Sequence, residues 1–167
     1  MADKDGMKTA KNFRPDIPFS GGRSLDGIKG IGGLDWGMQR RMTHIFRPED
    51  GKTVMLAFDH GYFMGSTSGL ERLDLLIPTL MDHVDVLMGT RGAFRTCVPS
   101  GNRCALALRV SSGSSVIDED LSHEVVAVGI EDALRLDADA MAVQVFIGAD
   151  GEKESISNLS KVRIVVK

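Results

Sequence analysis

The stretch VMLAFDHGYF, residues 54–63, changes character halfway along its length. Its first half is a short, continuous apolar run, which is typical of a strand that is covered on both faces. Asp59 and His60 follow directly, and Gly61 comes next. The segment therefore predicts a buried strand, starting at Thr53, that delivers a carboxylate and an imidazole to its carboxyl end.

Strand-like and helix-like segments alternate from this point onward. Four apolar runs predict strands, at residues 53–58, 84–91, 104–111 and 138–148, and the short run 163–166 is compatible with the start of a fifth. Segments with helical character lie between and after them, at residues 66–84, 119–136 (with an interruption at Gly129) and 152–162. Strands joined by helices in this order build right-handed βαβ units and a parallel sheet. Alternation alone leaves an open doubly wound sheet and a (β/α)8 barrel as alternatives.

Two helices carry recognisable boundary signals. Asp35 is placed to cap a helix over residues 36–46, on which Trp36, Met42, Ile45 and Phe46 are predicted to share one face. In the segment 66–84, Ser68 and Glu71 have the spacing of a capping box, and Pro78 is expected to divide the helix in two. Residues 1–33 are rich in Gly, Lys and Asp, lack periodicity, and are interpreted as an N-terminal arm.

Composition excludes several classes of function. The 167 residues carry a net charge of −3, with 43% hydrophobic and 26% charged residues, so no basic footprint for nucleic acid is present. No apolar run approaches the ~20 residues of a membrane span, and the polar N-terminus lacks a signal-peptide core. Two cysteines are too few for a disulfide scaffold, and the histidines lack metal-ligand spacing. We expect a cytoplasmic protein without metal, nucleic-acid or membrane partners.

Polar side chains follow each predicted strand, where parallel sheets place their sites. Asp59 and His60 end the first strand, Arg91 the second, Ser111 the third and Gln144 the fourth. Asp59 is a candidate for moving a proton or orienting a substrate hydroxyl, and the alternative is a structural N-cap. Because neighbours on a strand point to opposite sides, Asp59 and His60 are not expected to act as one dyad. Arg91 suits an anionic substrate group or, alternatively, an ordinary ion pair, and Ser111 and Gln144 are candidate substrate ligands.

Four longer segments resemble one family. They are LDWGMQRRMTHIF (34–46), GKTVMLAFDHGYFMGSTSGLERLD (51–74), DVLMGTRG (85–92) and AVQVFIGADGEKESI (142–156). They are similar to the class I aldolases of the DhnA type, and within them to the autoinducer-2 processing branch, over the chain as far as about Leu159. The resemblance implies a (β/α)8 TIM barrel of which residues 34–167 form the N-terminal half, with about four βα units. It also implies a cytoplasmic homo-oligomer and catalytic roles for Asp59 and His60.

The implied chemistry is carbon–carbon bond cleavage through a Schiff base, on a phosphorylated carbonyl substrate, with an acetyl group passed to coenzyme A as co-substrate and no other cofactor. Such chemistry needs a lysine at a strand end, and no lysine occurs between Lys52 and Lys153. We therefore expect a truncated barrel that lacks the Schiff-base lysine, is inactive alone and associates through its open sheet edges. The alternatives are a class I fructose-bisphosphate aldolase and, in another class, a non-catalytic half-barrel or partner-binding subunit.

Overall fold

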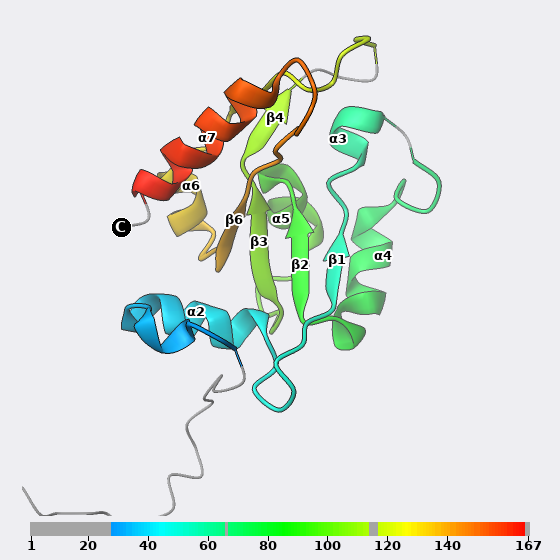
Figure 1. The fold of residues 1–167 in the computed structure, drawn as a ribbon. Helices are drawn as coiled ribbons and strands as arrows, with labels where there is room; N and C mark the ends of the chain where they lie inside the picture. Colours follow the sequence, from blue (N-terminus) through cyan, green and yellow to red (C-terminus); the bar gives the residue numbers. More distant parts are fainter. Residues whose placement is uncertain (1–27, 66, 114–116, 166–167) are drawn as a thin grey trace, which may run out of the picture.

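The fold is a parallel sheet with helices along one face (Figure 1), and the computed structural model describes residues 28–65, 67–113 and 117–165. Most of the arm predicted over residues 1–33 lies outside the described residues. The elements in chain order are η1 (Ile31–Gly33), α2 (Trp36–Ile45), β1 (Met55–Ala57), α3 (Gly61–Met64), α4 (Leu73–Leu80), η2 (Met81–His83), β2 (Val86–Gly89), α5 (Arg91–Cys97), β3 (Ala105–Arg109), β4 (Ser111–Gly113), β5 (Glu124–Val126), α6 (Ile130–Arg135), β6 (Ala140–Ala142) and α7 (Glu152–Val165).

The main sheet has the strand order β1-β2-β3-β6, and all of its neighbouring strands are parallel. The prediction of an α/β fold with four parallel strands is confirmed. Neighbouring strands are aligned side by side without a large offset: Leu56 of β1 lies opposite Leu87 of β2, and Leu87 lies opposite Leu106 of β3. Their carboxyl ends therefore lie along one edge of the sheet, where a shared site can form.

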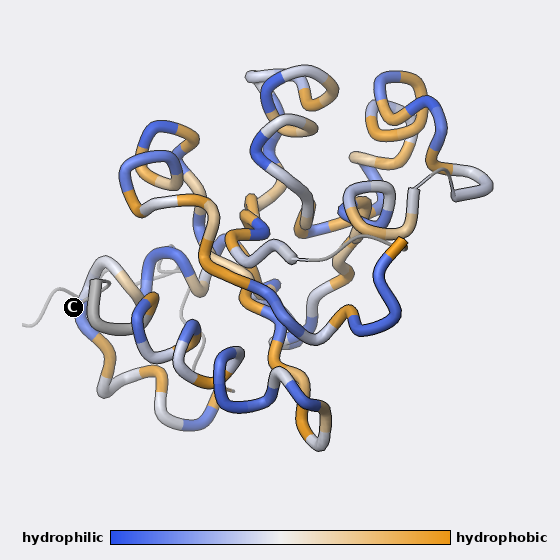
Figure 2. Tube along the Cα trace, turned by 90° about the horizontal axis from the view of Figure 1, so that it is seen from above, coloured by the Kyte–Doolittle hydropathy of each residue, from blue (hydrophilic) through white to orange (hydrophobic). Residues whose placement is uncertain are grey.

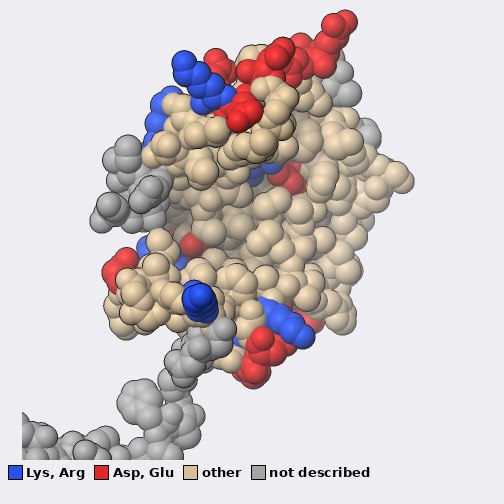
Figure 3. Space-filling view, in the orientation of Figure 1, with Lys and Arg blue, Asp and Glu red and all other residues tan. Residues whose placement is uncertain are grey.

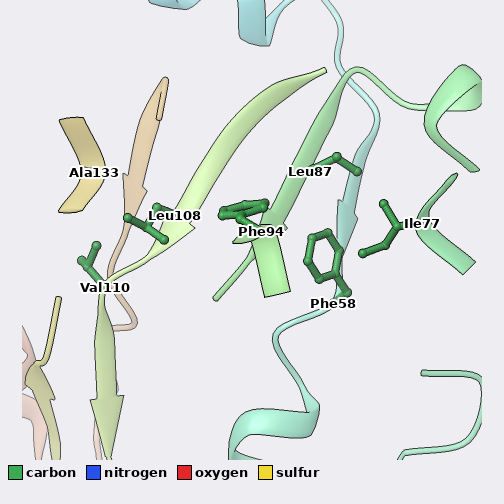
Figure 4. Close-up of a cluster of buried hydrophobic side chains, with 7 residues drawn as sticks. All are labelled: Phe58, Ile77, Leu87, Phe94, Leu108, Val110 and Ala133. Carbon is green, nitrogen blue, oxygen red and sulfur yellow. The ribbon is translucent and has the colours of Figure 1, made fainter. Parts of the chain in front are cut away.

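The two faces of the sheet are packed differently because side chains alternate along each strand. Leu87 and Leu108 point to the face that is covered by the helices, where they meet Ile77 of α4, Phe94 of α5 and Ala133 of α6 (Figure 4). The rings of Phe58 and Phe94 pack edge to face, with centroids 5.7 Å apart. Seen from above, these helices stand along one side of the sheet (Figure 2).

The opposite face carries smaller side chains. Val86, Ala105 and Ala107 are buried there, and Ile45 of α2 packs against them from the amino end of the strands. Arg109 has the same parity as Ala105 and Ala107, so it belongs to this second face at the carboxyl end. This face, and not the helix-covered one, presents the polar strand ends.

A short antiparallel ribbon continues from the main sheet. Val110 separates β3 from β4, and β4 pairs with β5. The backbone N–H of Val110 donates to the carbonyl of Ala142 in the main sheet, at 3.0 Å. Its carbonyl accepts from the N–H groups of Ala127 and Val128, which follow β5, at 2.9 and 3.3 Å. One fully buried residue thus joins the two sheets.

Helix α2 has the predicted N-cap, and none of its residues is fully buried. The Asp35 carboxylate accepts a hydrogen bond from the Met38 N–H at 3.1 Å, as expected of a cap. Of the four residues predicted to share one face, Met42, Ile45 and Phe46 are partly buried, whereas Trp36 is 77% exposed. It occupies the first position of the helix and lies at the rim of a cavity described below.

Helix α4 begins later than the capping-box pattern predicted. It starts at Leu73, and the Glu71 carboxylate instead accepts from the N–H of Gly69 at 2.8 Å. Pro78 lies inside α4 and does not divide it, and the helix passes into η2 after Leu80. The fully buried Ile77 beside Pro78 offsets the cost of the missing backbone donor.

Two other predictions along the chain are wrong. The segment 119–136 is not one helix, because Val125 and Val126 form β5 by pairing with β4, and α6 begins only at Ile130. Valine is stiff at its branched Cβ and suits a strand once a partner strand is available. The run 163–166 does not open a strand either, since α7 continues through it to Val165.

Candidate active site

Three strand ends converge on the guanidinium group of Arg109. Arg109 Nη1 donates to Asp59 Oδ2 at 2.8 Å, and Nη2 donates to Glu124 Oε1 at 2.6 Å and to Gln144 Oε1 at 2.8 Å. Arg109 Nε donates to the carbonyl of Ser111 at 3.0 Å and to its hydroxyl at 3.2 Å. We call these five residues the Arg109 cluster. Its members come from the carboxyl ends of β1, β3 and β6 and from the β4–β5 ribbon.

The Arg109 cluster is buried and carries a formal charge of −1. Asp59 is 3% exposed, Glu124 5% and Arg109 8%. One guanidinium therefore faces two carboxylates, and the attraction between them is weakly screened in such a setting. Buried charges of this kind are tolerated only where hydrogen bonds satisfy them. Glu124 Oε2 is the exception, because it is buried without a hydrogen-bond partner among the described residues. Glu124 Oε2 is thus an acceptor that the other described residues leave unused.

Hydrogen bonds to neighbouring elements fix the cluster in place. The Ser111 hydroxyl accepts from the backbone N–H of Gln144 at 3.0 Å, which ties β4 to the end of β6. Asn158 of α7 donates to the Glu124 carbonyl at 2.6 Å, so the helix holds β5 in register behind the carboxylate. A side chain held by packing and such bonds can act with little loss of rotamer entropy.

Helix α3 covers the cluster. The Phe63 ring centroid lies 5.6 Å from Arg109 Cζ, at the distance of a cation–π contact. The Tyr62 hydroxyl forms a hydrogen bond with the Ser112 hydroxyl of β4. Only three residues separate β1 from α3, so the segment Asp59–His60–Gly61 connects the Arg109 cluster directly to the helix that covers it.

His60 lies beside Asp59, and not on the opposite side of a strand as predicted. The strand ends at Ala57, so the alternation rule no longer holds at residues 59 and 60. His60 Nδ1 is 3.8 Å from Asp59 Oδ1, too far for a hydrogen bond, and it has no hydrogen-bond partner among the described residues. The N-cap alternative for Asp59 is wrong as well, since His60 occupies the cap position of α3 and the Asp59 carboxylate binds Arg109.

The structure brings Asp59, Ser111 and Gln144 together but leaves Arg91 apart. Arg91 Nη1 donates to Asp132 Oδ2 at 2.9 Å, in a partly exposed ion pair between α5 and α6. This is the arrangement that its alternative interpretation predicted. A role for Arg91 in binding substrate stays a prediction.

Sequence reasoning missed Arg109 and Glu124. A signal for Arg109 was present in ALALRV, residues 105–110, because an arginine in an apolar strand needs a buried partner. Glu124 gave no such signal, since its segment reads as part of a helix. The contact between Glu124 and Arg109 depends on the pairing of β4 with β5.

The lysines of the described residues lie away from the parallel strand ends. Lys29 and Lys52 precede β1, and Lys153 and Lys161 belong to α7. Among the same residues, no His, Cys, Asp and Glu side chains gather in threes around a possible metal position. None of the helices in the described ranges has both the length and the hydropathy that crossing a bilayer requires.

Comparison with solved structures finds the same fold in aldolases. A Schiff-base-forming fructose-1,6-bisphosphate aldolase superposes with a TM-score of 0.65 at 21% identity, covering 77% of this chain and 53% of that one. An archaeal fructose-1,6-bisphosphate aldolase, solved with its catalytic lysine bound to the carbinolamine intermediate, gives a TM-score of 0.61 at 22% identity with the same coverage. The described residues have an α/β fold that matches about half of these TIM-barrel structures.

Sequence comparison is more specific. The 3-hydroxy-5-phosphonooxypentane-2,4-dione thiolase of Photorhabdus laumondii is 52% identical over 162 residues, which are 97% of this chain and 55% of that protein. The thiolase of the same name from Escherichia coli K12 is 50% identical over 164 residues, and an uncharacterized aldolase of Pasteurella multocida is 52% identical over 159. The chain is a homologue of these thiolases, with the fold of a DhnA-type class I aldolase. It spans about half the length of the curated relatives it matches. No protein-family model matches the sequence.

Proposed function

We propose that this chain supplies the Asp59 side of a Schiff-base active site that cleaves a phosphorylated dione and passes its acetyl group to coenzyme A. The proposal rests on one observation above all, the convergence of Asp59, Arg109 and Gln144 at the carboxyl ends of three parallel strands. The homology to 3-hydroxy-5-phosphonooxypentane-2,4-dione thiolases supports the choice of substrate class.

The Arg109 cluster has the charge that such chemistry requires. A neutral lysine amine adds to a substrate carbonyl to give a carbinolamine, which takes up one proton and loses water. The resulting iminium is a cation that accepts the electrons of the breaking carbon–carbon bond. A buried site with a formal charge of −1 stabilises this cation, because a positive charge compensates the second carboxylate. Glu124 Oε2 is the acceptor that has no other partner among the described residues.

Asp59 is the proposed proton carrier of this half of the site. Arg109 holds its carboxylate by Oδ2, which leaves Oδ1 to face a substrate hydroxyl or the proton that moves during bond cleavage. His60 Nδ1, at 3.8 Å from Oδ1, is the group nearest to relay that proton once the two atoms come into hydrogen-bond range. The described residues contain no strand-end lysine, so the amine is assigned to residues outside this set.

Borohydride trapping tests the proposal. The full chain is incubated with a phosphorylated ketone such as dihydroxyacetone phosphate, reduced with borohydride and analysed by mass spectrometry. We expect no adduct on this chain alone. We expect an adduct on the second polypeptide when the chain is mixed with the part of a homologous thiolase that it does not cover. Asp59→Asn should lower turnover of the mixture, and Asp132→Asn, which alters only the Arg91 ion pair, should not.

Two outcomes would contradict the proposal. An adduct on this chain alone would show that one of its own lysines serves as the amine. Failure of the mixture to form an adduct, although the two parts associate, would remove the assignment to Schiff-base chemistry. Turnover of fructose 1,6-bisphosphate in place of the phosphorylated dione would favour an aldolase.

A second candidate function is a non-catalytic half-barrel that binds a partner. The observation in its favour is that β1 and β6 each have one strand neighbour within the described sheet, so each presents a row of backbone groups. This reading predicts association with a complementary polypeptide without any adduct, and the same mixing experiment distinguishes it.

A further inference from the structure

A cavity lies at the opposite end of the sheet from the Arg109 cluster. It is formed between α2 and the segments that lead into β3 and β6, and its volume is about 410 Å³. Its wall includes Cys104 and Leu106 at the amino end of β3, whereas Arg109 ends the same strand. With ~3.3 Å per residue, the length of β3 separates the two places by more than 10 Å. Figure 3 shows this side of the molecule hollowed above α2. The cavity is therefore a separate site.

Three arginines line the cavity without a hydrogen-bond or ion-pair partner in the part of the chain that the structure describes. Arg40 and Arg41 come from α2, and Arg103 comes from the segment before β3. None of their guanidinium groups forms an ion pair or a hydrogen bond with another described residue, unlike Arg47, Arg72, Arg91 and Arg109. Guanidinium groups that converge on one space bind phosphate well, because each presents a planar fork of donors to the phosphate oxygens.

The acidic side chains of the wall do not cancel this charge. Asp139 is committed to the protein, since Oδ1 pairs with His44 Nδ1 at 2.8 Å and Oδ2 accepts from the Leu106 N–H at 3.0 Å. Asp137 is exposed at the rim. Counted over its three arginines and two aspartates, the wall carries a formal charge of +1.

Two further side chains of the wall, Asn102 and Trp36, indicate which other groups a bound phosphate compound would carry. Asn102 lines the cavity, and its Oδ1 is buried without a hydrogen-bond partner among the described residues, while its Nδ2 donates to the Pro99 carbonyl at 3.1 Å and fixes the orientation of the amide. An acceptor in this position calls for a donor, such as a hydroxyl or amino group. Trp36, whose side chain is largely exposed at the rim, offers a flat apolar surface.

Cys104, by contrast, is a packing group in this wall. Its thiol donates to the carbonyls of Met81 and Val84, and burial, with the nearby Asp85 and Asp82 charges, raises the pKa of Cys104 above its ordinary value. The wall thus presents cations, one acceptor and an aromatic surface, but no reactive thiolate.

We propose that this cavity binds a phosphate ester that also carries hydroxyl groups, with the phosphate on Arg40, Arg41 and Arg103 and a hydroxyl on Asn102 Oδ1. A sugar phosphate and a nucleotide share this chemistry. They differ in the base, which only a nucleotide can stack on Trp36. The site is distinct from the Arg109 cluster and does not depend on the proposed function.

Calorimetry and fluorescence on the full chain test the proposal. Ribose 5-phosphate, AMP and inorganic phosphate are titrated by isothermal calorimetry, and the emission of Trp36, the chain's single tryptophan, reports whether the base of AMP stacks at the rim of this cavity. We expect saturable binding, tighter for the two esters than for inorganic phosphate. A change in Trp36 emission with AMP and none with ribose 5-phosphate identifies a nucleotide, and comparable affinities for the two identify a sugar phosphate.

Substitutions locate the contact. Arg103→Gln should weaken binding of the ester about tenfold or more, equivalent to about 1.4 kcal/mol, and Arg103→Lys should recover part of the affinity. Arg95→Gln, an exposed arginine on α5, is the matched control and should leave the affinity unchanged. Because Arg40 and Arg103 are exposed, their variants should unfold at the same urea concentration as the parent chain.

The proposal is wrong if the esters give neither heat nor a change in Trp36 emission. It is equally wrong if binding is unaffected by substitution of Arg103 and of Arg40, or if Arg95→Gln weakens it to the same extent.

Discussion

Replacing Arg109 by methionine tests whether the Arg109 cluster is an electrostatic unit. The substitution keeps much of the aliphatic volume but removes five hydrogen bonds, two of them to carboxylates. Asp59 and Glu124 then remain buried without a counter-charge, and the formal charge of the cluster changes from −1 to −2. The comparison is Asp59→Asn, which keeps the shape, leaves Arg109 paired with Glu124 and brings the charge to zero.

The structure predicts unequal costs for the two substitutions. Removing one partner of a buried ion pair costs about 3–5 kcal/mol, mainly through the charge left behind. Losing one charge-assisted hydrogen bond while the remaining charges stay paired costs about 1.5–3 kcal/mol. Arg109→Met should therefore destabilise the chain by about 1–2 kcal/mol more than Asp59→Asn. That is a measurable part of the ~5–15 kcal/mol that stabilises a typical domain.

Urea unfolding followed by far-ultraviolet circular dichroism measures the free energy of unfolding of Arg109→Met and of Asp59→Asn. The protein concentration is one at which all variants elute alike in size-exclusion chromatography. The double variant completes a cycle and isolates the coupling of Asp59 with Arg109, which should exceed about 0.5 kcal/mol. If Asp59→Asn costs as much as Arg109→Met, or more, the charge argument is refuted and the cluster is held by packing alone.

Three further outcomes are expected. His123 Nδ1 lies 3.1 Å from Glu154 Oε2, and the hydrogen bond to Glu154, with the charges of Asp120 and Asp150, raises the pKa of His123 above its ordinary value. The stabilisation it provides is full below the ordinary histidine pKa and is lost as pH rises through the raised value. The melting temperatures of the parent chain and of His123→Gln should thus differ at pH 6 and converge near pH 9. Gly89→Ala should destabilise by about 1–3 kcal/mol in urea unfolding, because a Cβ at Gly89 would overlap the Phe58 ring, whereas Gly92→Ala, which has open space, should not. The edge strands β1 and β6 should make the chain elute as an oligomer or aggregate in size-exclusion chromatography, and a sharp monomer peak with a cooperative melting transition would contradict this.

The parallel sheet and three of the five residues of the Arg109 cluster could be predicted from the sequence, because both depend on local patterns. Apolar runs that stop at a polar residue mark strands and their carboxyl ends, and this pattern led to Asp59, Ser111 and Gln144. Arg109 and Glu124 could not be placed in the same way. Their contact depends on β4 pairing with β5, two short segments whose partner is set by the fold and not by their own composition. His60 was misplaced because β1 ends at Ala57, one residue before the end of its apolar run and three residues before His60.

The position of Val110 limits which insertions and deletions the Arg109 cluster can tolerate. It is the single residue between Arg109 and Ser111, and its backbone is bonded to one sheet on its N–H side and to the other on its carbonyl side. Inserting or deleting one residue here would turn Ser111, or Arg109, to the opposite face. The segment Arg109–Val110–Ser111 therefore has a fixed length, and below we call it the spacer. Loops elsewhere in the barrel can vary in length, but the distance along the chain from cation to hydroxyl cannot, and any transplant of the site to another scaffold has to carry the spacer intact.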